Sequence, residues 1–103
     1  MLHRFSDSKI IFESDDSLGK FIGDIKNLQF VHLSISKNGL IASHKLDVEV
    51  IFHVLNGRGE IVVDGNKTSL FKGDIISVNP NCNREWINSG SNPLELLVIK
   101  VMD

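Results

Sequence analysis

The sequence predicts an all-β fold built from short antiparallel strands. Runs rich in Ile, Val, Leu and Phe recur along the 103 residues, and Gly, Asn, Asp or Pro separate them at regular intervals. Pairs such as Asn56-Gly57 and Asp64-Gly65 are strong hairpin signals, because the tightest turns need positive φ angles. Strands at this spacing are typical of a sandwich or a barrel and not of an alternating α/β fold.

Each predicted element is an apolar run bounded by turn residues. The first strand is followed by Asp15–Ile25, which is predicted to hold one helical turn capped by Asp16 or Ser17, although its glycines disfavour a helix. Every later element is a strand, and the turn at Asp64-Gly65 joins the clearest hairpin. The predicted strands are, in chain order, Lys9–Glu13, Leu28–Ser36, Leu40–His44, Glu49–Leu55, Glu60–Asp64, Thr68–Phe71, Ile75–Val78, Arg84–Ile87 and Leu94–Val101.

The composition indicates one globular domain over residues 1–103, since 42% of the residues are hydrophobic and 23% are charged. The formal net charge is -2 and no basic block stands out, so no nucleic-acid partner is expected. No apolar run approaches the ~20 residues of a membrane span, and the N-terminus lacks the apolar core of a signal peptide. The single cysteine, Cys82, fits a reducing compartment. We therefore expect a cytoplasmic protein with no membrane partner.

Two stretches of the chain resemble the paired motifs of the cupin superfamily. The first runs from Gly39 to Gly59 and contains His44, where the family has the first His of a His-x-His pair. The second runs from Gly73 to Asn88 and contains the Gly-Asp turn and the proline of the family pattern. The resemblance covers about half of the chain. It implies a small single-domain cupin, whose fold is a double-stranded β-helix or jelly-roll barrel.

The resemblance also implies a metal site that lacks most of its ligands. Family members hold a divalent metal with three His and one Glu that point into the barrel. In this chain Leu46 stands at the second His, Val50 at the Glu and Glu85 at the third His. His44 and Glu85 are then the remaining ligands, and two protein ligands are too few for firm binding of a transition metal. No metal cofactor is expected.

A divalent transition metal is the alternative cofactor, and it would need a third ligand beside His44 and Glu85. Glu49 would supply that ligand if a bulge at Val48 turned it inward. His32 would supply it if the side chain entered from a neighbouring strand.

Strand periodicity predicts a pocket on the face that carries these positions. Alternate residues of a strand share a face, and burying Val50, Phe52 and Val54 costs less than burying Glu49 and His53. Apolar walls with a few polar groups are typical of a small-molecule site. The residues predicted to line the ligand pocket are His44, Leu46, Val50, Phe52, Glu85 and Ile87.

The favoured function is binding of a small, partly apolar ligand in a barrel without a metal. The rival is a cupin enzyme, either a metal-dependent oxygenase or isomerase, or a metal-free isomerase in which His44 and Glu85 act as acid and base. Both readings stay open at the level of the sequence. Small cupins often dimerise through N-terminal strands, so the resemblance implies a homodimer, with Lys9–Glu13 and the exposed face of Glu49–Leu55 as candidate interfaces.

Three further residues lie close to the second motif. Cys82 sits in a loop with no base beside it in the sequence, so an inert cysteine is expected. Trp86 is expected in the core or in an interface. Arg84 adjoins Glu85 with the opposite strand parity and is a candidate for anion binding.

Overall fold

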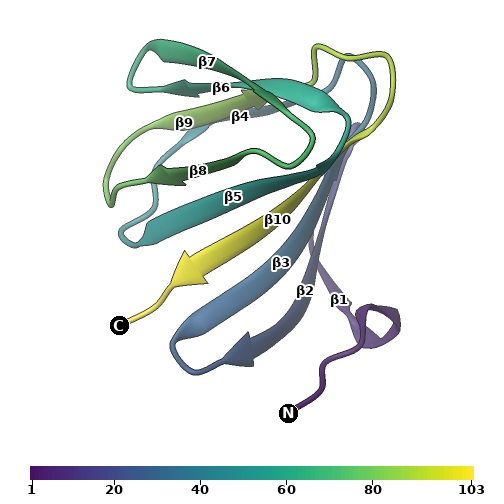
Figure 1. The fold of residues 1–103 in the computed structure, drawn as a ribbon, viewed down its shortest axis with the longest axis vertical. Coiled ribbons are helices and arrows are strands. Elements are labelled where there is room, and N and C mark those ends of the chain that lie inside the picture. Colours follow the sequence, from purple (N-terminus) through teal and green to yellow (C-terminus); the bar gives the residue numbers. More distant parts are fainter.

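The fold consists of two antiparallel β-sheets that face each other (Figure 1). The structure is a computed structural model that describes all residues from Met1 to Asp103. A short 3-10 turn, η1, at Phe5–Asp7 precedes the first strand. None of the helical segments is long and apolar enough to span a membrane. The architecture confirms the predicted all-β jelly-roll fold.

All neighbouring strands in both sheets are antiparallel. The larger sheet has six strands in the order β1-β2-β3-β10-β5-β8, with bounds β1 Lys9–Glu13, β2 Ser17–Ile25, β3 Leu28–Ile35, β10 Leu94–Val101, β5 Glu49–Asn56 and β8 Ile75–Val78. The smaller sheet has four strands in the order β4-β9-β6-β7, with bounds β4 Leu40–His44, β9 Arg84–Ile87, β6 Arg58–Val63 and β7 Asn66–Phe71.

The predicted strands are all present. Those at Lys9–Glu13, Leu40–His44, Ile75–Val78, Arg84–Ile87 and Leu94–Val101 keep their predicted bounds. The others differ by one or two residues at their ends, where strands give way to turns.

The predicted helical turn in Asp15–Ile25 is wrong, because this segment forms the long strand β2 between β1 and β3. Its glycines permit close packing. A Cβ atom at Gly19 would lie 3.2 Å from the Cβ of Phe12 on β1, and one at Gly23 would collide with the ring of His3. Glycine inside a strand often marks such a close approach. Tertiary packing therefore decides the structure of this segment, and the weak local helix signals do not.

The core lies between the two sheets, and β5 shows how the strand period builds it. Val50, Phe52 and Val54 are all buried, while the residues between them are only partly buried. This confirms the predicted inward face of the strand. Alternation of the same kind buries Leu94 and Leu96 on the neighbouring strand β10.

The β6–β7 hairpin has the two-residue turn that its sequence predicts. Asp64 has a φ of 47° and Gly65 a φ of 85°, and two successive positive angles are typical of a type I′ turn. The side chain of Asp64 also accepts a hydrogen bond from the backbone N–H of Asn83 at 2.8 Å. The turn therefore anchors the loop that leads into β9.

A Gly65→Ala substitution tests the turn. No atom would lie within 4 Å of an added Cβ, so the cost comes from the positive φ alone. We expect the free energy of unfolding, measured with urea, to fall by about 1 kcal/mol. Gly65→Asn should cost less, because Asn tolerates this conformation better than Ala. Equal stability of the Ala variant and the wild type would contradict the turn geometry.

Candidate functional site

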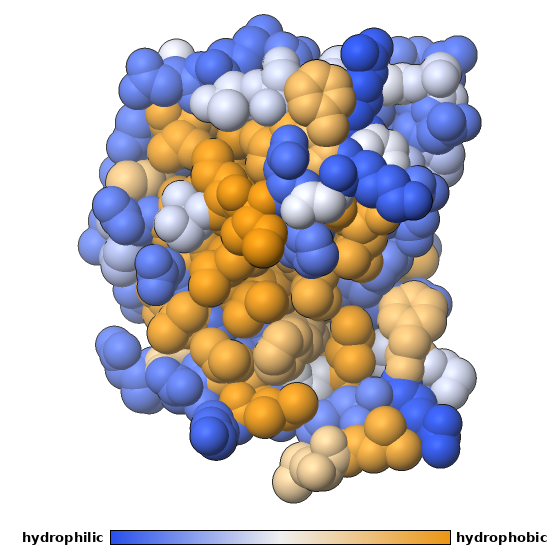
Figure 2. Space-filling view, in the orientation of Figure 1, coloured by the Kyte–Doolittle hydropathy of each residue, from blue (hydrophilic) through white to orange (hydrophobic).

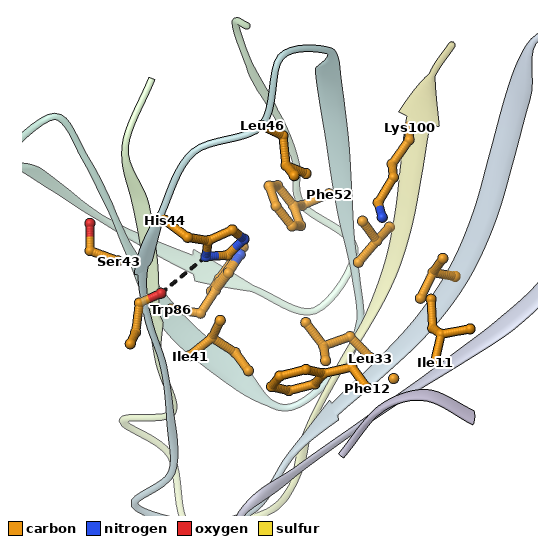
Figure 3. A pocket seen from close by; sticks show the side chains of 14 residues that line it. Ile11, Phe12, Leu33, Ile41, Ser43, His44, Leu46, Phe52, Trp86 and Lys100 are labelled. Atoms are coloured by element: carbon orange, nitrogen blue, oxygen red, sulfur yellow. Dashed lines mark hydrogen bonds between the residues drawn. The ribbon is translucent and has the colours of Figure 1, made fainter. Parts of the chain in front are cut away.

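A cavity of about 460 Å³ opens between the two sheets. Ten of its fourteen lining residues are hydrophobic, and all of these except Leu46 come from strands of the two sheets. Figure 3 shows Ile41, Leu33 and Phe12 gathered at one end of the cavity, with Ile11 beside them. Since Ile11 and Phe12 belong to β1, one of the two edge strands of the larger sheet forms part of the wall.

His44 reaches the cavity because β4 is irregular. The register between β4 and β9 shifts between Ile41 and His44, which places His44 directly opposite Arg84. Such a bulge re-aims the side chains that follow it. The Nδ1 atom of His44 lies 3.0 Å from the carbonyl oxygen of Ala42. Because a carbonyl can only accept, Nδ1 is the donor, and Nε2 is the ring nitrogen that a ligand could engage.

Trp86 supplies another wall of the cavity from β9. Its side chain packs edge-on against Phe52, with ring centroids 5.3 Å apart and an interplanar angle of 69°. Trp86 is only 1% exposed, and its indole Nε1–H has no hydrogen-bond acceptor in the protein. A buried donor without an acceptor is costly, and functional sites are one place where such donors occur.

Lys100 brings an ammonium group to the cavity. It follows Leu96 and Val98 on the inward face of β10, and Figure 3 shows its amino group directed into the cavity. No carboxylate lies within ion-pairing distance of Lys100. Lys100 lies outside the two cupin-like motifs of the sequence. The alternation of buried positions along β10 would have placed it on the inner face.

The structure brings three of the predicted pocket residues, His44, Leu46 and Phe52, to the cavity. Val50 is fully buried but belongs to the packed core, where it pairs with Val78 of β8 and does not reach the cavity wall.

Glu85 and Ile87 do not line the cavity either, because β9 turns the opposite face inward. Its buried residues are Arg84 and Trp86. Either orientation of this strand buries one charged residue. The observed one also buries the large indole, and the stem of an arginine is itself apolar, so this orientation costs less. As a result Glu85 does not oppose His44 across the cavity.

Arg84 is fully buried beside the loop that precedes β9. Its Nε atom donates a hydrogen bond to the carbonyl oxygen of Cys82 at 3.3 Å, while both Nη atoms lack a partner. Burial lowers the pKa of the guanidinium from its usual value. At Cys82, a hydrogen bond to Asp64 raises the thiol pKa, which keeps the sulfur in its unreactive protonated form.

The side chains present do not fit a cupin-type metal ion. At the positions that match the family's ligands, Leu46 and Val50 cannot coordinate, and Trp86 takes the inward place that the sequence assigned to Glu85. His44 is then the one ligand of this set that faces the cavity. A transition-metal site needs at least three such donors.

The two residues proposed as additional ligands are directed elsewhere. Glu49 has the same strand parity as Ile51 and His53, on the outer side of β5. The Nε2 atom of His32 lies 3.1 Å from a carboxylate oxygen of Glu95, on the outer face of β3 and β10. No three His, Cys, Asp or Glu side chains gather where they could hold one metal ion.

Residues 31–100 match the family model described as the cupin domain. No curated protein matches the chain. Among solved structures, KdgF from Halomonas sp. is similar with a TM-score of 0.84 and 13% identity, covering 100% of this chain and 94% of that one. An RmlC-like cupin from Shewanella frigidimarina is similar with a TM-score of 0.83 and 17% identity, covering 97% and 88%. The polyketide cyclase RemF from Streptomyces resistomycificus has a TM-score of 0.82 and 17% identity, covering 100% and 81%. At these identities the likeness shows the fold.

Replacing Arg84 tests the cost of burying its charge. Arg84→Met keeps an apolar stem and removes the guanidinium, so we expect the free energy of unfolding to stay equal or to rise. Arg84→Ala should be less stable than Arg84→Met by about 2 kcal/mol or more, because it also leaves a cavity. Urea denaturation of the three proteins measures both differences. A loss of more than about 1 kcal/mol in Arg84→Met would mean that the guanidinium has a favourable partner.

Proposed function

The chain belongs to the cupin family, and we propose that it binds a small, partly apolar ligand in the cavity between its two sheets. The observation that carries this proposal is the cavity itself, with its volume of about 460 Å³ and its mostly hydrophobic wall. Ligand sites usually have volumes of about 300–1,000 Å³, apolar walls and a few polar groups that fix orientation. His44, Trp86 and Lys100 are such polar groups here.

The rival proposal of a metal-free isomerase has less support. It needs His44 and Glu85 on opposite sides of one substrate, within hydrogen-bond reach of the proton that moves. Glu85 lies on the outward face of β9, with Val62 of β6 as its neighbour across the sheet. The cavity offers one imidazole and one ammonium group and no carboxylate. These side chains therefore suit ligand binding better than the transfer of a proton between two carbon atoms of a substrate.

Filling the cavity tests ligand binding. Leu33→Phe places a larger side chain at the apolar end of the cavity, and Ile87→Phe makes a comparable enlargement on the outer face of β9. We expect the wild type and Ile87→Phe to bind the neutral dye N-phenyl-naphthylamine, and Leu33→Phe to bind it at least roughly tenfold more weakly. The variant should still fold, since overpacking costs about 1–3 kcal/mol.

Dye fluorescence measures the affinity, and circular dichroism confirms that each variant is folded. Equal binding by Leu33→Phe and the wild type would place the dye outside the cavity. Absence of dye binding to the wild type would count against the proposed function.

We also propose that the protein forms a homodimer through the outer face of its larger sheet. Apolar residues occupy outward positions on adjacent strands of this face, among them Ile51 on β5 and Leu97 and Ile99 on β10. Figure 2 shows an apolar area on this side of the molecule. The edge strand β1 adds Ile10, which is 56% exposed. A second copy of the chain would cover these residues.

The mass in solution tests the dimer. We expect light scattering coupled to size-exclusion chromatography to give twice the chain mass of 11.5 kDa. Ile99→Glu should shift the protein toward the monomer, because a carboxylate in an apolar interface is costly. Ile87→Glu, on the smaller sheet, should leave the mass unchanged. A monomeric wild type at micromolar concentration would refute the proposal.

A further inference from the structure

Two polar groups at the cavity, Lys100 and Trp86, donate hydrogen bonds or carry positive charge. Lys100 brings an ammonium group without a carboxylate partner. Trp86 brings an indole N–H without an acceptor. No Asp or Glu lines the cavity, although acidic residues outnumber basic ones in the chain, 13 to 11. The cavity is therefore locally cationic in a protein that is acidic overall.

The surroundings of Lys100 indicate which charge a ligand should carry. Its partners across the sheet are Gln29 on β3 and Val50 on β5, so neither neighbouring strand places an anion opposite it. An inward position on β10 otherwise carries a buried apolar residue, as at Leu96 and Val98. A cation that faces apolar walls lacks the compensation that an opposite charge would provide. A negatively charged ligand would supply it.

Trp86 points to the same class of ligand. Indole Nε1–H is a donor only, so its partner must be an acceptor atom. Leaving a buried donor unsatisfied costs about 1–3 kcal/mol. A ligand oxygen that accepts this hydrogen bond removes that cost. An alkylammonium group has no lone pair to accept the indole hydrogen bond, and its charge repels that of Lys100.

The apolar end of the cavity restricts the rest of the ligand. In Figure 3, His44 and Lys100 lie on opposite sides of the cavity, and Leu33, Ile41 and Phe12 lie together at one end. A fully polar anion such as phosphate would leave these apolar walls in contact with water. An anion with a hydrocarbon or aromatic body would bury them.

Building on the proposed binding function, we infer that the ligand is an apolar monocarboxylate. Its carboxylate pairs with the ammonium group of Lys100. Its hydrocarbon or aromatic body packs against Leu33 and Ile41. The charge of Lys100 sets the preference for an acid over an alcohol or an amine of the same length.

The test compares octanoate, n-octanol and octylamine, which share one chain and differ in the head group. Trp86 is the single tryptophan of the chain and lines the cavity, so its fluorescence reports occupancy directly. We expect octanoate to bind roughly tenfold or more tightly than octanol, as a hydrogen bond to a charged group allows, and octylamine to bind most weakly.

Variants of Lys100 test whether its charge causes the preference for octanoate over octanol. Lys100→Met keeps the length of the side chain without its charge, and should reduce octanoate affinity to that of octanol while leaving octanol binding unchanged. Lys100→Arg keeps the charge and should keep the preference. Lys72→Met, in the exposed turn before β8, is the matched control and should behave like the wild type. Circular dichroism shows whether each variant is folded. If Lys100→Met does not fold, Lys100→Arg and the three ligands on the wild type still test the inference.

The outcomes separate this inference from the binding proposal. If octanol and N-phenyl-naphthylamine bind to the wild type but octanoate binds no more tightly than octanol, the cavity binds ligands and the inference of a carboxylate is wrong. An octanoate preference that survives in Lys100→Met also overturns the assignment to Lys100. If none of these compounds binds, the proposed function fails, and the inference fails with it.

Discussion

The packing of Trp86 against Phe52 is the interaction on which the arrangement of the site depends. It joins β9 of the smaller sheet to β5 of the larger one across the interior. Once the indole is buried, the alternation of β9 fixes which neighbours turn inward and which outward. Arg84 is thereby drawn into the interior, and Glu85 is left outside. The side chains that β9 presents to the interior therefore depend on which of its faces points inward.

Much of the fold is readable from the sequence, because strand period and turn residues act locally. The hairpin at Asp64-Gly65 is an example, since both residues adopt the positive φ angles that their types allow. The strand β2 is not readable in this way. Its Gly19 weakens both a helix and a strand as a local signal, and only Phe12 of the neighbouring strand explains why glycine is there.

The candidate site was harder to predict than the fold, for two physical reasons. The orientation of β9 is decided by competition between two faces that each carry one charge. Matching Glu85 to the third His of the family pattern takes no account of the apolar area of Trp86. The cavity also draws on β1, β3 and β10, which lie outside the two motifs. Lys100 comes from β10, where only the alternation of the strand predicts that its side chain faces inward.

The edge position of β1 links the stability of this strand to the binding of a ligand in the cavity. This strand pairs only with β2, all of its residues are exposed, and yet Ile11 and Phe12 form part of the cavity wall. A strand with so few buried contacts opens at a lower free energy than the central strands. A ligand that touches this wall and binds only while β1 is paired stabilises β1 by linkage, and the stabilisation rises with the logarithm of one plus the ratio of the free ligand concentration to Kd. Amide exchange along β1 is therefore expected to slow when a ligand occupies the cavity.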